Sequence, residues 1–136
     1  MLVKVHALLW DGERIVVNEE RRQGVTHLTL PGGRVLDRER LEVALRREVE
    51  EEIGVRIVVG RLLYAAEVVH GHSVHDVCLI FAADAVTPLP AGTRAMTPAE
   101  ADGQVRPPIM QHVAVDGPGG PPGTRWLGNL WHSRDA

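Results

Sequence analysis

Four glutamates stand within five positions in the stretch LRREVEEEIGV, residues 45–55. Carboxylates this close repel one another, and a like-charged pair at i and i+4 destabilises a helix by roughly 0.2–0.5 kcal/mol even when exposed. Carboxylate oxygens are also the ligands that hard divalent cations such as Mg²⁺ and Mn²⁺ prefer, together with phosphates and water. The stretch therefore indicates either the acidic rim of an amphipathic helix or a site for a divalent cation.

The position of these glutamates around a helix bears on the choice. At about 100° per residue, the aliphatic side chains of the predicted helix form one stripe, made of Leu41, Leu45, Val49 and Ile53. Glu52 falls within this stripe, Glu48 beside it and Glu51 further round, whereas Glu50 points toward solvent. An unpaired carboxylate on the core side is costly, and a cation between Glu48 and Glu52 would remove that cost. The wheel alone leaves both interpretations open.

The residues before the helix add a longer pattern. Pro31-Gly32-Gly33 opens a loop whose backbone can approach a ligand closely, because glycine has no Cβ. Residues 33–55 read GRVLDRERLEVALRREVEEEIGV and match G-x5-E-x7-R-E-U-x-E-E-x-G-U, with U aliphatic, at every defined position. At any one starting position, seven fixed residues at about 7% usage each coincide by chance on the order of once in 10⁸. This pattern is the Nudix box, and the chain resembles the Nudix hydrolase family, with no subfamily indicated.

The resemblance implies an α+β fold, a Nudix-like α/β/α sandwich built on a mixed sheet with few helices. It also implies a pyrophosphohydrolase dependent on Mg²⁺ or Mn²⁺ that cleaves a nucleoside diphosphate linked to another moiety, by attack of water on phosphorus. The alternative is a catalytically weak module of the same fold that senses or binds nucleotides.

The resemblance also assigns roles to single residues. The metal ligands would be the carbonyl of Gly33 and the carboxylates of Glu48, Glu51 and Glu52. Arg47 would orient these carboxylates. Glu39 would brace the loop against the helix or hold a metal-bound water on the substrate side.

The general base is less closely defined by the resemblance. It would be a glutamate of the box, Glu48 or Glu52, or a glutamate on a later loop, for which Glu100 is the candidate. A second interpretation of the same stretch has Thr97 capping a short helix with Pro98 at its first position. For the substrate, Arg34 beside the glycines and His27 in the preceding strand are candidate phosphate contacts. Arg38 stands where many Nudix boxes have glycine, which leaves the hydrolytic residues untouched.

The surrounding elements must position this loop and helix. Leu2–Trp10 and Glu13–Asn18 predict a hairpin around Asp11-Gly12. A strand is expected at Thr26–Leu30, a helix at Arg40–Ile53 ending at Gly54, one bulged strand or two strand pieces at Val55–Val69, and a strand at Asp76–Val86. Strands before and after one strong helix favour α+β over a regular βαβ array. The histidines of HGHSVH (residues 70–75) are interpreted as an exposed turn rather than a metal site.

The C-terminal part has a different composition. From about residue 97 it is rich in proline and glycine, and GPGGPPG (residues 117–123) excludes helix and central strand. The segment TRWLGNLW that follows is expected to dock back, on its own subunit or on a partner, because tails seldom carry two tryptophans. A single domain over residues 1–136 is predicted.

Charge and composition exclude several classes of function. The net charge of −3 argues against binding of a nucleic acid duplex. No apolar run approaches the roughly 18 residues of a membrane span, and the single cysteine, Cys78, provides neither a disulfide nor a cysteine zinc site. The composition makes a cytoplasmic setting the expectation. The resemblance implies the partners: a small nucleotide diphosphate substrate and a second copy in a homodimer.

Overall fold

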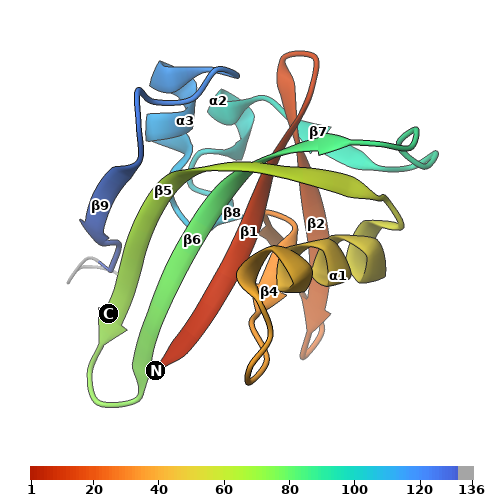
Figure 1. Cartoon of the computed structure of the whole chain (residues 1–136). Helices are drawn as coiled ribbons and strands as arrows, with labels where there is room; N and C mark the ends of the chain where they lie inside the picture. The colour runs from red at the N-terminus through yellow and green to blue at the C-terminus, as the bar shows by residue number, and fades with distance from the viewer. Residues whose placement is uncertain (132–136) are drawn as a thin grey trace.

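The computed structural model describes residues 1–131, which form one mixed sheet and three helices (Figure 1). The strands are β1 (Leu2–Asp11), β2 (Arg14–Arg22), β3 (Val25–Thr29), β4 (Gly32–Arg34), β5 (Ile57–His70), β6 (Val74–Ala85), β7 (Arg94–Met96), β8 (Val105–Arg106) and β9 (Arg125–Asn129), and the helices are α1 (Leu41–Ile53), α2 (Pro98–Ala101) and α3 (Met110–Asp116). The sheet runs in the order β8-β3-β2-β1-β6-β5-β9, with β4 also paired to β1 and β7 to β2. The predicted α+β fold with a mixed sheet is confirmed, since β1–β6, β3–β8 and β5–β9 are parallel and the other pairs antiparallel.

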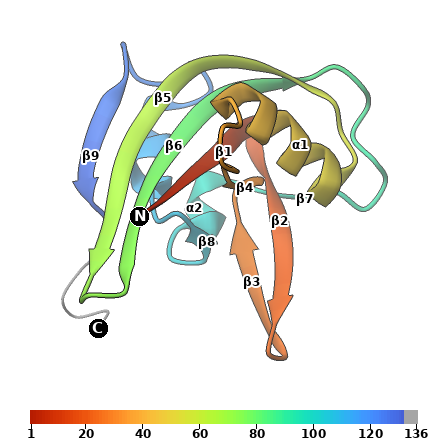
Figure 2. The ribbon, with the colours of Figure 1, turned by 60° about the horizontal axis from the view of Figure 1, so that its bottom comes forward.

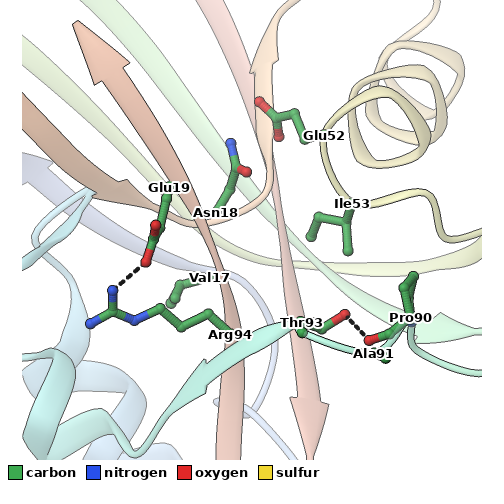
Figure 3. Close-up of a pocket in the computed structure, with 10 residues that line it drawn as sticks. Val17, Asn18, Glu19, Glu52, Ile53, Pro90, Ala91, Thr93 and Arg94 are labelled. Atoms are coloured by element: carbon green, nitrogen blue, oxygen red, sulfur yellow. Dashed lines mark hydrogen bonds and ion pairs between the residues drawn. The ribbon is translucent and has the colours of Figure 1, made fainter.

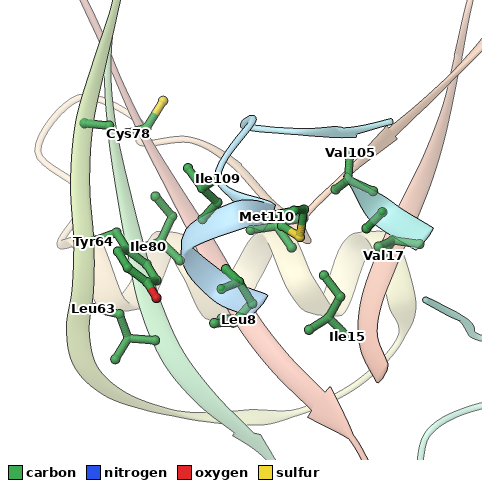
Figure 4. Close-up of a cluster of buried hydrophobic side chains, with 14 of the residues drawn as sticks. Leu8, Ile15, Val17, Leu63, Tyr64, Cys78, Ile80, Val105, Ile109 and Met110 are labelled. Carbon is green, nitrogen blue, oxygen red and sulfur yellow. The ribbon is translucent and has the colours of Figure 1, made fainter. Parts of the chain in front are cut away.

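The helices cover the two faces of the sheet because side chains alternate along β1. Val5, Ala7 and Leu9 lie in one hydrophobic cluster with Ala44, Leu45 and Val49 of α1. Leu8 of the same strand lies in the other cluster, with Met110 and Val113 of α3 (Figure 4). Each face of the central strands is therefore sealed by helices of a different part of the chain.

The strand β1 changes partners along its length, and this opens the sheet near the glycines. It pairs with β2 only at Trp10↔Ile15 and Asp11↔Arg14, which is the predicted hairpin. Toward its start it pairs with β4 instead, through His6↔Gly32, Val5↔Gly33 and Lys4↔Arg34. The β2–β3 hairpin consequently diverges from β1 (Figure 2), and the box glycines lie beside this opening.

The helix α1 begins one residue after the predicted start and ends where expected. Gly54 adopts a left-handed conformation with φ 77°, and its N–H donates to the carbonyl of Glu50. Leu45 and Val49 are fully buried, as the helical wheel predicts, whereas Leu41 in the first turn is 38% exposed. The stripe that faces the sheet therefore begins after the first turn.

The C-terminal segment docks on its own chain. The loop 117–123 is held by the Arg61 guanidinium, which donates to the carbonyls of Gly119, Pro121 and Gly123 at 3.1, 2.5 and 2.9 Å. The strand β9 then runs parallel to β5, which is itself one strand with register shifts between Val59 and Tyr64. The predicted docking and the bulged strand are confirmed, and residues 132–136 of the predicted domain lie outside the described residues. In the described part, no helix has the length and apolar character needed to cross a membrane.

Candidate functional site

Glu52 connects the last turn of α1 with the glycine strand β4. Its Oε1 accepts the N–H of Gly32 at 2.8 Å. Burial raises the pKa of Glu52 to about 7 against the lowering effect of this hydrogen bond, and the nearby carboxylates of Glu48, Glu20 and Glu51 raise it further. A negative charge at this position is therefore costly in the protein alone and would be stabilised by a cation.

Arg47 holds the loop and the helix together. Its Nε and Nη2 donate to Oε2 and Oε1 of Glu39, both at 2.8 Å, and Nη2 also donates to the Arg34 carbonyl at 3.2 Å. Its Nη1 lies 2.9 Å from Glu48 Oε1 and 3.5 Å from Glu51 Oε2. This guanidinium lowers the pKa of the Glu39 carboxyl to about 2, while Glu39 and Glu48 together raise the pKa of Arg47. Both members of the bidentate pair are thus charged at neutral pH.

Glu39 acts on the loop as well as on the arginine. Its Oε1 accepts the N–H of Leu36 at 3.0 Å, so one carboxylate binds both the loop backbone and the helix. Of the two roles that the resemblance offers for Glu39, the geometry shows the brace.

The two glycines of β4 are packed too closely for any side chain. A Cβ on Gly33 would lie 2.7–2.9 Å from the Glu48 carboxylate, and a Cβ on Gly32 would lie 2.0 Å from the Val5 carbonyl oxygen. Gly32 also has φ 149°, a conformation that other residues rarely adopt. The glycines therefore let the backbone of residue 33 and the carboxylate of Glu48 come together.

The donor set of the box suits a hard divalent cation. Three carboxylates and a backbone carbonyl offer only oxygen ligands, which Mg²⁺ and Mn²⁺ prefer. Among residues 1–131, no three candidate ligand side chains already converge on one point, because Arg47 engages Glu48 and Glu51 and Gly32 engages Glu52. A cation at these ligands would compete with Arg47 for Glu48 and Glu51.

The strand β2 adds two residues that the sequence interpretation left out. Val16 lies in the hydrophobic cluster of α1, so Asn18 and Glu20 share its face by alternation. Glu20 lines a cavity with Gly32 and Gly33 and contributes to the raised pKa of Glu52. The strand predicted to end at Asn18 continues to Arg22, and the period-two pattern of its residues is the signal that could have found both.

Glu100 is not brought to this site. It belongs to a capping box in which its N–H donates to Thr97 Oγ1 at 3.2 Å and its Oε1 accepts the N–H of Thr97 at 3.1 Å. These hydrogen bonds lower the pKa of Glu100, which makes it a poorer proton acceptor. Pro98 stands in the first turn, so the capping interpretation is confirmed and the structure gives no support to Glu100 as the base.

Two cavities are lined by the glutamates or the glycine strand, and a third adjoins one of them. One of about 300 Å³ lies between β2, α1 and the loop before β7, where Asn18 and Glu52 face the same space and Glu19 pairs with Arg94 (Figure 3). A second, of about 540 Å³, contains Arg34 together with Gly33 and Glu20.

The third cavity lies against the other face of β1. It has about 440 Å³ and contains His27 on one wall and Trp131 on another. The second and third cavities share Lys4, His6, Arg22 and Thr29. They therefore adjoin. His70 stacks on Trp131 with ring centroids 3.9 Å apart, so this histidine packs at the cavity wall.

Comparison with known proteins agrees with this site. The model of the NUDIX domain matches residues 2–111. Two similar solved structures are both described as NUDIX hydrolases from Nitrosomonas europaea: one is 22% identical with TM-score 0.67 over 81% of this chain and 83% of its own, the other 16% identical with TM-score 0.74 over 94% and 77%. A MutT NUDIX hydrolase from Burkholderia pseudomallei is 28% identical with TM-score 0.58 over 65% of this chain and 70% of its own. No curated protein matches the sequence. With the domain model covering most of the chain and the box in place, the protein belongs to the Nudix family and is a hydrolase of phosphoric anhydride bonds.

Proposed function

We propose that this protein is a metal-dependent pyrophosphohydrolase that cleaves a nucleoside diphosphate linked to another moiety. The observation that carries the proposal is the joint placement of Gly33, Glu48 and Glu52, with the carboxylate of Glu48 against the Gly33 backbone. Carboxylates placed this close repel one another. A site that only binds a nucleotide has no need of that repulsion, because cationic side chains would hold an anionic substrate better than three carboxylates.

The cation would be held by the Gly33 carbonyl and the carboxylates of Glu48, Glu51 and Glu52. When bound, Mg²⁺ or Mn²⁺ neutralises the diphosphate and lowers the pKa of a water. Arg47 and Glu39 keep the loop and the helix in register, so that the carbonyl and the carboxylates stay on the same side. These two residues act by positioning rather than by contact with the reacting atoms.

The proton of the attacking water requires an acceptor. Glu48 is already paired with Arg47 at 2.9 Å, and this pairing weakens it as a base. Among residues 1–131, the Glu52 carboxylate accepts a hydrogen bond only from the Gly32 N–H. We therefore assign proton abstraction to Glu52 and ligation alone to Glu48.

The two adjoining cavities suit the remaining parts of the substrate. Arg34, beside Gly33, lies where it can bind the diphosphate. The nucleoside then extends into the cavity with His27, Arg22 and Arg106 on its walls, where the cationic groups also attract an anionic substrate. The size and the charge of the two cavities support this placement.

A nucleotide panel tests the proposal. Nucleoside diphosphate sugars, dinucleoside polyphosphates and nucleoside triphosphates are incubated with Mg²⁺ or Mn²⁺, and product nucleotides are separated by chromatography. Glu52→Gln is expected to lower kcat by about 10²–10⁴-fold. Glu50→Gln is the matched control, because Glu50 lies on the exposed side of the same helix, and it is expected to retain activity.

Two outcomes would overturn the proposal. Equal activity of wild type and Glu52→Gln would refute the assigned mechanism, and tight nucleotide binding without product would favour the sensing module. A homodimer and a cytoplasmic location stay predictions, which sedimentation and cell fractionation can check.

A further inference from the structure

His6 is a buried polar side chain that the hydrolytic site does not use. It is 8% exposed and lies on β1 opposite Gly32, one residue from the box glycine. Its ring lines both the cavity that contains Gly33 and the cavity that contains Trp131. His6 therefore lies at the boundary between the cavity beside the box glycines and the cavity that contains Trp131.

The hydrogen bonds of His6 define its tautomer. Nδ1 lies 3.3 Å from the carbonyl oxygen of Leu30, and because a carbonyl oxygen only accepts, Nδ1 carries the hydrogen. In the neutral ring Nε2 is then an acceptor, and none of the hydrogen bonds among residues 1–131 uses it. Burial, with a contribution from Lys4, lowers the pKa of His6 to about 4. The ring is therefore neutral at physiological pH, and its lone pair is available to a ligand.

The groups around His6 restrict the kind of ligand. Val68, Pro107, Pro108, Leu130 and Trp131 form apolar walls of the 440 Å³ cavity, which suit a flat ring. Of the charged residues that line this cavity, Lys4 and Asp76 pair with each other at 3.1 Å, and the guanidinium groups of Arg22 and Arg106 offer only donors. Within this cavity, His6 therefore offers a neutral hydrogen-bond acceptor. A flat ring that carries a hydrogen-bond donor would complement it.

We infer that His6 selects the nucleobase of the substrate, with Nε2 accepting a hydrogen bond from an N–H of an exocyclic amine. This inference rests on the proposed function, because it places the base in the cavity that adjoins the hydrolytic site. His6 is a specificity-determining residue and takes no part in the attack on phosphorus.

Three pairs of triphosphates that differ at one amine test the inference: those of adenosine and purine riboside, guanosine and inosine, and cytidine and uridine. Wild type is expected to prefer the amine-bearing member of at least one pair by at least about tenfold in kcat/KM. His6→Phe keeps a flat ring but removes the acceptor. It should reduce the preference to about twofold or less, mainly through a higher KM for the amine-bearing member. His72→Phe, in the exposed β5–β6 turn, is the matched control and should keep the preference.

A second measurement does not depend on turnover or on the folding of the variant. The ¹⁵N resonances of the His6 ring are recorded in wild type, with and without the α,β-methylene diphosphates of the same six nucleosides. Free protein should show the Nδ1–H tautomer, and Nε2 should shift only with amine-bearing probes.

The outcomes separate this inference from the proposed function. Three results would overturn the role of His6 and leave the hydrolase proposal standing. They are turnover with no preference within any pair, a preference that is unchanged in His6→Phe, and a bound probe that leaves the Nε2 resonance unshifted. An amine-dependent Nε2 shift without turnover supports the role of His6 and refutes the hydrolase proposal. If the protein shows no turnover and binds none of the probes, both proposals are refuted.

Discussion

Glu52→Gln should stabilise the metal-free protein although it removes a central residue of the site. Glutamine keeps an oxygen that can accept the Gly32 N–H, which Glu52 now accepts at 2.8 Å, while the charge near Glu48, Glu20 and Glu51 disappears. The rise in the pKa of Glu52 from 4.5 to about 7 corresponds to about 3.4 kcal/mol at 1.36 kcal/mol per pKa unit. Because the carboxylate is only partly buried, screening by water reduces this to about 1–2 kcal/mol. That free energy corresponds to roughly 3–8 °C in Tm.

The effect has a defined pH dependence. Below pH 4.5 Glu52 is protonated in both the folded and the unfolded state, so the charge costs nothing. As pH rises from 4.5 toward about 7, the unfolded chain ionises first and the wild type loses stability, after which the loss is constant. The difference in Tm between Glu52→Gln and wild type should therefore be small at pH 4.5 and full at pH 8.

Thermal unfolding in EDTA at both pH values, followed by circular dichroism, measures this difference. Glu50→Gln, from the exposed side of the same helix, should show almost no gain. Adding Mg²⁺ at pH 8 should raise the Tm of wild type much more than that of Glu52→Gln. A difference that is absent at pH 8, or equal at both pH values, would refute the argument from burial and repulsion. A Tm of wild type that is unmoved by Mg²⁺ would refute the cation site.

Three further predictions follow from the same contacts. Arg47→Lys keeps the charge but not the two parallel bonds to Glu39, so titration calorimetry should show Mg²⁺ affinity reduced about 10–100-fold; unchanged affinity would contradict the positioning role. Gly33→Ala should fold but lose activity, because its Cβ meets the movable carboxylate of Glu48. Gly32→Ala should fail to give soluble folded protein, because its Cβ meets the backbone of Val5. A folded Gly32→Ala variant together with an unfolded Gly33→Ala variant would contradict this packing. Glu100→Gln should keep kcat within about twofold of wild type, since its carboxylate caps α2, and a loss like that of Glu52→Gln would restore it as the base.

Local signals predicted much of this molecule. The Asp11-Gly12 pair predicted the first hairpin, whose two-residue turn is Gly12-Glu13 between the paired Asp11 and Arg14. Gly54 ends α1 because its left-handed conformation, with its N–H on the Glu50 carbonyl, suits glycine. The apolar positions Leu45 and Val49 were recognisable by their helical period. The short strands β4, β7 and β8 were not, because they have two or three residues and form only through pairing with distant strands.

The sequence by itself determined the chemistry: the spacing of the box places Glu48, Glu51 and Glu52 around one side of a helix that ends at Gly54. Tertiary structure decided what surrounds them. The pairing of β4 with β1 brings Gly33 against Glu48, and the divergence of β2 brings Glu20 near Glu52. Tertiary structure also decided that the Glu100 carboxylate accepts the N–H of Thr97 in the cap of α2. Helical period is local and readable along the chain, whereas the pairing of strands is a long-range result of packing the whole sheet.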